Sequence, residues 1–206
     1  MTDKQIKILL ILIPALLAAM LAFDKYDPAW LSFLKKAKAT PVNIPIKTSS
    51  DREEQVKKLA AIYLSEVGVR ELTGNNDGKR VEEYLAQTGH KAGAAWCAAF
   101  VSWCHNQAGI KAANSAWSPA WFPDNKTIYT HGFIKNTTPC RADVFGQYFP
   151  QKRRIAHVGF IDDWDDDTSY CITVEGNTND GGSREGDGVY RKRRLKNQIY
   201  KVSRWI

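Results

Sequence analysis

The sequence contains little cysteine and none of the spacings that usually hold a metal ion. Its 206 residues include four cysteines, too few for a small disulfide-built fold and unnecessary in a chain long enough to bury a core. No C-x-x-C or H-x-x-x-H spacing occurs, and Cys104 and His105 are adjacent on a predicted helix, so their side chains point apart. We therefore predict no metal and no cofactor.

Internal repeats are also absent, which excludes a separate binding module built from them. The hydrophobic fraction of 44% suits one globular domain and excludes a disordered chain. The formal net charge of +7 favours an anionic partner, without choosing among nucleic acid, anionic lipid and an acidic polymer.

Charge is missing from residues 8–23, ILLILIPALLAAMLAF, which follow Lys4 and Lys7. These 16 residues are longer than the apolar region of many signal peptides and shorter than a full membrane span of about 20. A basic start followed by an apolar run is typical of an export signal. No A-x-A cleavage site follows it, so residues 1–23 are predicted to be either a signal peptide or an uncleaved membrane anchor. By the positive-inside rule, the residues after the run would instead lie in the cytoplasm, because four lysines follow it, at positions 25, 35, 36 and 38. We still favour export, because the chemistry below suits it.

Residues 24–50 contain three prolines and are predicted to form a tether, so the globular domain should occupy residues 51–206. Helical spacing of apolar residues predicts a first helix from Ser50 to Gly68 and a second over about 79–88, ending at Gly89. A third helix is predicted over about 94–108, where AAWCAAFVSWC is apolar on every side and should be buried. Cys97 and Cys104 are seven residues apart, about two turns, and share a face. We expect Cys104 to be a core residue, whereas Cys97 lies in the first turn, where the helix dipole stabilises a thiolate.

From residue 140 onward the pattern predicts strands: 142–145, 155–164, 170–177 and a last one beginning near Val189. The second and third alternate, and Asp165 to Asp167 between them predict a hairpin turn. A hairpin centred on Asp166 would place Phe160 opposite Ile172 and His157 opposite Glu175. The fold class is therefore α+β, with helices first and an antiparallel sheet after them.

This order brings together the groups of a thiol hydrolase. A nucleophilic cysteine needs a base that keeps it ionised, and the base needs a partner that fixes its tautomer. Cys97 supplies the thiol and His157 the base, and Glu175, Asn177 or both would orient the imidazole. The non-catalytic alternative is a His–Glu pair at the surface beside an inert cysteine.

Three segments, WCAAFVSWC, AHVGFIDDW and VEGNTNDGGSREGDGVYRKRR, resemble the CHAP (cysteine, histidine-dependent amidohydrolase/peptidase) domains of peptidoglycan hydrolases. These domains belong to the papain-like superfamily and are related to NlpC-type endopeptidases. The resemblance covers about residues 60–205 and implies a papain-like fold with Cys97 as nucleophile, His157 as base, and Glu175 and Asn177 completing the site.

Two positions depart from that family. Ala142 stands where a glycine is usual, and Trp96 stands where many members have a glutamine that binds the oxyanion. The backbone N–H of Cys97 is then the oxyanion donor that we expect. Trp96, Trp117 and Trp121 are the candidate substrate-binding residues, although the last two could instead cover the core.

Other residues have competing interpretations. Cys140 and Cys171 are either two isolated buried thiols or, in an exported protein, a disulfide that braces the site. The remaining histidines are expected at the surface or at helix ends, at positions 90, 105 and 131. The basic runs QKRR (151–154) and YRKRRLK (190–196) are either solvated charge or a surface that holds anionic wall polymer.

The resemblance implies cleavage of an amide bond in peptidoglycan, either the sugar–peptide amide or a bond of the stem or cross-bridge peptide. The expected partners are peptidoglycan as substrate and the membrane for the N-terminal segment, in the periplasm or cell envelope, with residues 8–23 as the possible anchor. One alternative is a catalytically inactive wall-binding or scaffold protein of an envelope or secretion machine. A nucleic-acid-associated membrane protein is the other, but we expect no nucleic acid partner.

Overall fold

A computed structural model describes residues 49–135, 137–181 and 186–206. The predicted signal or anchor at residues 1–23, and nearly all of the predicted tether at 24–50, lie outside this part. Among the described residues, no helix has both the length and the apolar character needed to cross a membrane. Residues from 49 onward belong to one compact unit.

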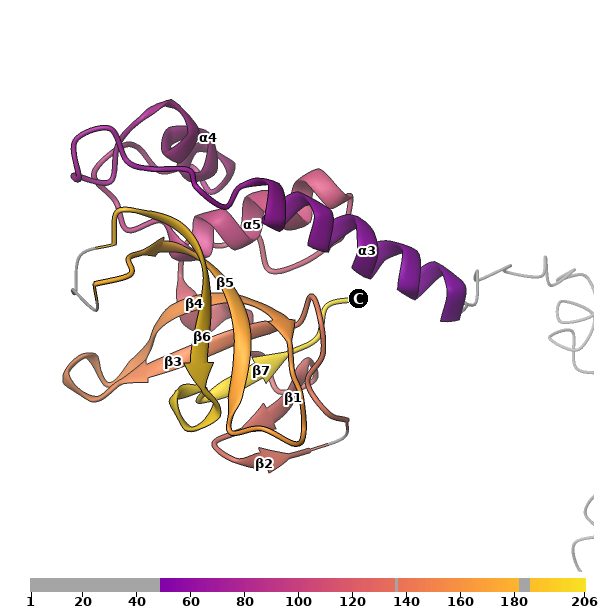
Figure 1. Ribbon diagram of the computed structural model, residues 1–206. Helices are drawn as coiled ribbons and strands as arrows, with labels where there is room; N and C mark the ends of the chain where they lie inside the picture. Colours follow the sequence, from indigo (N-terminus) through magenta and orange to yellow (C-terminus); the bar gives the residue numbers. More distant parts are fainter. Residues whose placement is uncertain (1–48, 136, 182–185) are drawn as a thin grey trace, which may run out of the picture. The chain divides into compact units, whose positions relative to one another are not determined.

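Three α-helices lie on one side of the described unit: α3 (Ser49–Ser65), α4 (Lys79–Gln87) and α5 (Cys97–Ala108) (Figure 1). All three were predicted within a few residues. Helix α5 is buried over most of its length and ends at Gly109, whose φ of 73° is the left-handed value favoured after a helix. The predicted start at residue 94 was three residues early, because Cys97 is the first helical residue.

One antiparallel sheet has seven strands among the described residues, in the order β2-β1-β7-β3-β4-β5-β6 (Figure 1). The bounds of these strands are β1 Thr127–Thr130, β2 Phe133–Ile134, β3 Val144–Phe149, β4 Arg154–Asp163, β5 Tyr170–Thr178, β6 Gly188–Leu195 and β7 Lys201–Ser203. The α+β class is confirmed. The expectation that the strand near Val189 is the last was wrong, because β7 follows it and pairs between β1 and β3. Strands β1, β2 and β7 are too short for their alternation to stand out in the sequence.

Two apolar clusters cover the two faces of the sheet. The larger lies between the helices and the sheet and includes Phe100 and Cys104 of α5 with Val158, Phe160 and Val174 of the strands. The smaller lies on the opposite face. Helix α5 packs directly on β4 and β5, so these two strands and the start of α5 form the frame of the site.

The hairpin of β4 and β5 is present, but its register differs from the predicted one by two residues. Phe160 pairs with Val174 instead of Ile172. The pairing then shifts between Ile161 and Asp163, so Asp162 is a bulge residue; its buried carboxylate accepts hydrogen bonds from Tyr63 and Arg191. A two-residue shift preserves which residues share a face, so His157 and Glu175 stay on one face as diagonal neighbours.

Candidate active site

Cys97 is the first residue of α5 and keeps only 5% of its surface exposed. The residue before it, Trp96, caps the helix without a side-chain hydrogen bond, and its carbonyl accepts the first helical bond, from Phe100 N–H at 2.8 Å. The first N–H groups of a helix have no partner within the helix. The thiol therefore lies at the positive end of the helix dipole, as the sequence predicted.

The start of α5 is held against β5 by close packing. Gly176 of β5 faces Trp96 and Phe100, and a Cβ on this glycine would lie 2.6 Å from the Trp96 ring. The Trp96 indole N–H also donates to Glu71 Oε1 at 2.7 Å. These contacts leave the helix start little room to move relative to the strand that carries Glu175.

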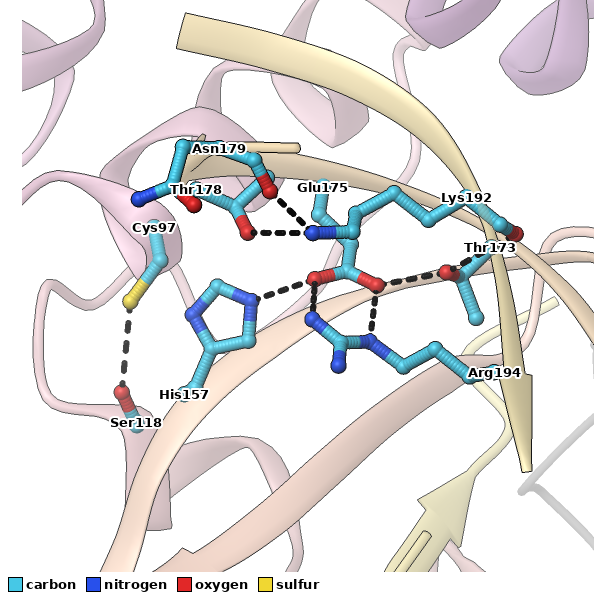
Figure 2. Close-up of polar contacts among 9 residues, drawn as sticks. All are labelled: Cys97, Ser118, His157, Thr173, Glu175, Thr178, Asn179, Lys192 and Arg194. Atoms are coloured by element: carbon cyan, nitrogen blue, oxygen red, sulfur yellow. Dashed lines mark hydrogen bonds and ion pairs between the residues drawn. The ribbon is translucent and has the colours of Figure 1, made fainter. Parts of the chain in front are cut away.

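His157 of β4 and Glu175 of β5 form a buried pair, with His157 Nε2 2.8 Å from Glu175 Oε2 (Figure 2). Gly159 makes this diagonal contact possible. It lies opposite Glu175 in the observed register, and a Cβ there would lie 2.9 Å from Glu175 Cγ. The carboxylate holds Nε2, which leaves Nδ1 for the thiol.

Arg194 and Thr173 complete the surroundings of Glu175, which has no exposed surface (Figure 2). The Arg194 guanidinium donates to both carboxylate oxygens, and the Thr173 hydroxyl donates to Oε1 at 2.5 Å. Burial alone would raise the pKa of Glu175, but the hydrogen bonds from Arg194 and His157 outweigh it and hold the pKa well below its usual range. The carboxylate is therefore ionised and fixed in place.

The thiol and the imidazole shift each other's pKa in opposite directions. Burial alone would raise the pKa of Cys97, but hydrogen bonding to the His157 ring and its charge outweigh burial and lower it. Burial alone would lower the pKa of His157, but the hydrogen bonds to Cys97 and Glu175 raise it to about 9. Ser118 adds a further contact, with its hydroxyl oxygen 3.8 Å from Cys97 Sγ. These shifts favour a thiolate–imidazolium pair near neutral pH.

Of the two residues expected to orient His157 singly or together, Glu175 contacts the ring and Asn177 does not. Its φ of 53° is left-handed, and its amide donates to Asn76 Oδ1 at 2.6 Å and to Glu71 Oε1 at 3.4 Å. The pairing of β5 with β6 is irregular between Glu175 and Thr178, which turns Asn177 away from the His157 ring. Asn177 ties the 71–77 loop to the sheet, and Glu175 is the residue that holds the His157 ring.

The three candidate substrate-binding tryptophans differ in exposure. Trp96 and Trp121 are fully buried, so neither presents a surface to a substrate in this conformation. Trp121 packs against His105 and Trp205. Trp117 is 54% exposed and immediately precedes Ser118, so it remains a candidate contact beside the thiol.

Sequence reasoning missed Ser118, Thr173 and Arg194. Arg194 belongs to a basic run interpreted as solvated charge or a wall-polymer surface, yet its side chain is only 15% exposed. The signal for it was the register of the last two predicted strands, because Arg194 and Thr173 share the face of Glu175. No sequence signal pointed to Ser118, which lies in the short 3₁₀ helix η1 (Ser118–Trp121).

The other three cysteines are free thiols, as is Cys97. The disulfide considered for Cys140 and Cys171 is therefore not present. Cys140 contacts the Arg204 guanidinium at 3.1 Å, while Cys171 is buried. Cys104 has no exposed surface, and burial raises its pKa well above the ordinary thiol value, as expected for a core residue.

His105 lies in the last turn of α5, which agrees with the helix-end alternative, and its side chain is buried. Its Nδ1 bonds the Val101 carbonyl at 2.9 Å, and its ring lies between Trp121 and Phe160. Burial lowers its pKa to about 4. In the part of the chain that the structure describes, no three His, Cys, Asp or Glu side chains are grouped to hold a metal ion.

No family model and no curated protein matches the chain. Among solved structures, the crystal structure of Ly7917 matches with a TM-score of 0.40 and 14% identity, over 71% of this chain and 61% of that one. The crystal structure of Ly7917 with the hydrolyzing product of MDP matches with a TM-score of 0.40 and 13% identity, over 73% and 63%. The chain thus spans about three fifths of the length of both. At this similarity neither assigns a family or an activity to it.

Proposed function

We propose that this protein is a cysteine hydrolase of the CHAP type that cleaves an amide bond in peptidoglycan. The observation that carries the proposal is the position of His157, which bonds Glu175 and faces Cys97 (Figure 2), with the pKa of the thiol lowered and that of the imidazole raised. The resemblance of the three sequence segments to CHAP domains supports the substrate class and a papain-like form of the α+β fold. The basic, then apolar N-terminus supports action outside the cytoplasm, in the periplasm or cell envelope.

The reaction begins with attack of the Cys97 thiolate on the amide carbonyl carbon. The backbone N–H of Cys97 stabilises the oxyanion. The His157 imidazolium gives its proton to the leaving amine, which breaks the C–N bond and leaves a thioester on Cys97. The neutral imidazole then takes a proton from water, whose oxygen attacks the thioester and releases the acid. Glu175 keeps the ring in the orientation and tautomer that both proton transfers require.

The test compares the full-length protein with three variants on purified cell-wall sacculi. Wild type should release soluble fragments with new amino groups, which mass spectrometry identifies along with the bond that is cut. Cys97→Ala and His157→Ala should release none above background. Cys104→Ala removes a thiol from the same helix without touching the site, so it should behave as wild type. If wild type and Cys97→Ala release the same fragments in equal amounts, the proposal is refuted.

The small exposure of the site favours a second candidate, an inactive wall-binding or scaffold protein. Only 5% of Cys97 and 8% of His157 are exposed, so access to the thiol is narrow. Alkylation by iodoacetamide at neutral pH separates the two candidates, because a catalytic thiolate reacts much faster than an ordinary thiol. Slow labelling of folded Cys97, with full labelling after unfolding, would favour the inactive protein.

A further inference from the structure

The basic run QKRR, residues 151–154, lies where β4 begins, three residues before His157. Four arginines around the sheet are neutralised by buried carboxylates: Arg194 by Glu175, Arg204 by Asp143, and both Arg141 and Arg191 by Asp162. Arg154 is not one of them; like Arg193 of β6, it lies over an aromatic ring instead. Within the described ranges no carboxylate pairs with it; its contacts are the Ile155 carbonyl at 3.0 Å and the ring of Trp117.

The register of β3 and β4 turns Arg154 toward the site. Gln147 pairs with His157 and Tyr148 with Ile155, so Ala156 is an extra residue in β4. One extra residue reverses the alternation of faces. Arg154 pairs with Phe149, which shares the face of Gln147, so Arg154 and His157 lie on one face although they are three positions apart, an odd number.

The Arg154 guanidinium lies over an exposed ring, that of Trp117, which directly precedes Ser118 in the chain. Its central carbon lies 4.3 Å from the centre of the Trp117 ring. The next residue after Trp117 is Ser118, whose hydroxyl contacts Cys97. Trp117, the residue before η1, and Arg154 of β4 therefore place a positive charge one residue along the chain from the Ser118 side chain that contacts the thiol.

A fixed, planar guanidinium without an acidic partner suits a carboxylate, which it can bind through two parallel hydrogen bonds. Arg154 and His157 are three positions apart on a strand, about 10 Å between their Cα atoms. An extended peptide spans that distance in about three residues. A carboxylate held at Arg154 would thus lie two or three residues from the amide carbonyl at Cys97.

The geometry points to a carboxylate-binding subsite made of Arg154 and Trp117, by which the enzyme selects peptides that carry a free carboxylate near the scissile amide. This inference rests on the proposed hydrolase function and adds a substrate class to it. Amidation of the same carboxyl group removes its charge and one acceptor oxygen. The subsite should therefore discriminate between free and amidated stem peptides.

The test uses paired stem peptides that differ only in one free or amidated carboxyl group. Wild-type, full-length protein should cleave the free acid with a kcat/KM about 10- to 100-fold higher, the range for a hydrogen bond to a charged group, with the difference mainly in KM. Arg154→Gln should lose that preference because its kcat/KM falls for the free acid and stays the same for the amidated peptide. Arg154→Lys should restore part of the preference. Lys152→Gln removes one exposed charge nearby and should keep the full preference.

Protection of Cys97 from iodoacetamide measures binding without turnover. If neither peptide is cleaved but the free acid protects Cys97 in wild type and fails to do so in Arg154→Gln, the subsite stands and the hydrolase proposal falls for these substrates. If both peptides are cleaved equally by wild type, or if Arg154→Gln keeps the preference with an unchanged melting temperature, the subsite is refuted and the hydrolase proposal stands.

Discussion

Replacing Arg194 with glutamine removes the positive charge that neutralises Glu175 inside the sheet. Glu175 has no exposed surface and the Arg194 side chain is 15% exposed, so water replaces little of the lost interaction. The variant leaves an ionised carboxylate with the Thr173 hydroxyl and the His157 ring as its remaining bonded partners. Its effect on the free energy of unfolding measures how much the buried Glu175 carboxylate depends on Arg194.

Breaking a buried ion pair by removing one partner costs about 3–5 kcal/mol. Because Thr173 and His157 keep two bonds to the carboxylate, we expect Arg194→Gln to lower the free energy of unfolding by about 3 kcal/mol, the lower end of that range. The double variant with Glu175→Gln removes both charges. It should be more stable than the sum of the single effects by about 1–3 kcal/mol, since coupled neighbours are not additive.

Equilibrium unfolding in urea, followed by tryptophan fluorescence, supplies these free energies. Arg193→Gln is the matched control, because this neighbouring arginine is exposed and stacks on the Tyr170 ring at 3.7 Å. Its cost should stay below about 1 kcal/mol. The reasoning is refuted if Arg194→Gln costs no more than Arg193→Gln, or if the effects of Arg194→Gln and Glu175→Gln simply add.

The rate of Cys97 alkylation should rise with pH and reach half its maximum at a pH below 9.0, the ordinary thiol pKa. His157→Ala should move that midpoint to higher pH, and an unchanged midpoint would show that the imidazole does not stabilise the thiolate. Burial lowers the pKa of His105 from its ordinary value of 6.5 to about 4 in the folded protein. The contribution of neutral His105 to the free energy of unfolding is therefore complete above pH 6.5 and is lost as the pH falls toward 4. His105→Leu should reduce the pH dependence of the free energy of unfolding, measured in urea between pH 4 and 6.5. If that dependence is unchanged in the variant, another group causes it. Gly159→Ala should cost about 1–3 kcal/mol in urea unfolding and reduce sacculus cleavage, because its Cβ would lie 2.7 Å from the Val174 carbonyl oxygen and 2.9 Å from Glu175 Cγ; wild-type stability and activity would contradict this.

Local patterns in the sequence were enough to place Cys97 and His157 on their elements. The spacing of apolar residues predicted the buried helix with Cys97 in its first turn, because helical periodicity is a property of neighbouring residues. Alternation along the strands placed His157 and Glu175 on one face, and that inference survived a register error of two residues because a strand repeats every second residue.

The side-chain contacts between those elements were decided by the tertiary structure. The bulge at Asp162 moves the register, and Gly159 then opens the space through which Glu175 reaches His157. Arg194 reaches Glu175 across paired strands, a contact that depends on the register of β5 and β6. Ser118 meets Cys97 from 21 positions away.

The sequence by itself therefore determined the α+β class, the helix start that carries Cys97, and the shared face of His157 and Glu175. The tertiary structure alone decided that Glu175 contacts the His157 ring and that Asn177 does not. The physical reason is range. Periodicity and helix dipoles act over a few neighbouring residues, whereas a hydrogen bond across strands depends on bulges and packing that no local pattern encodes.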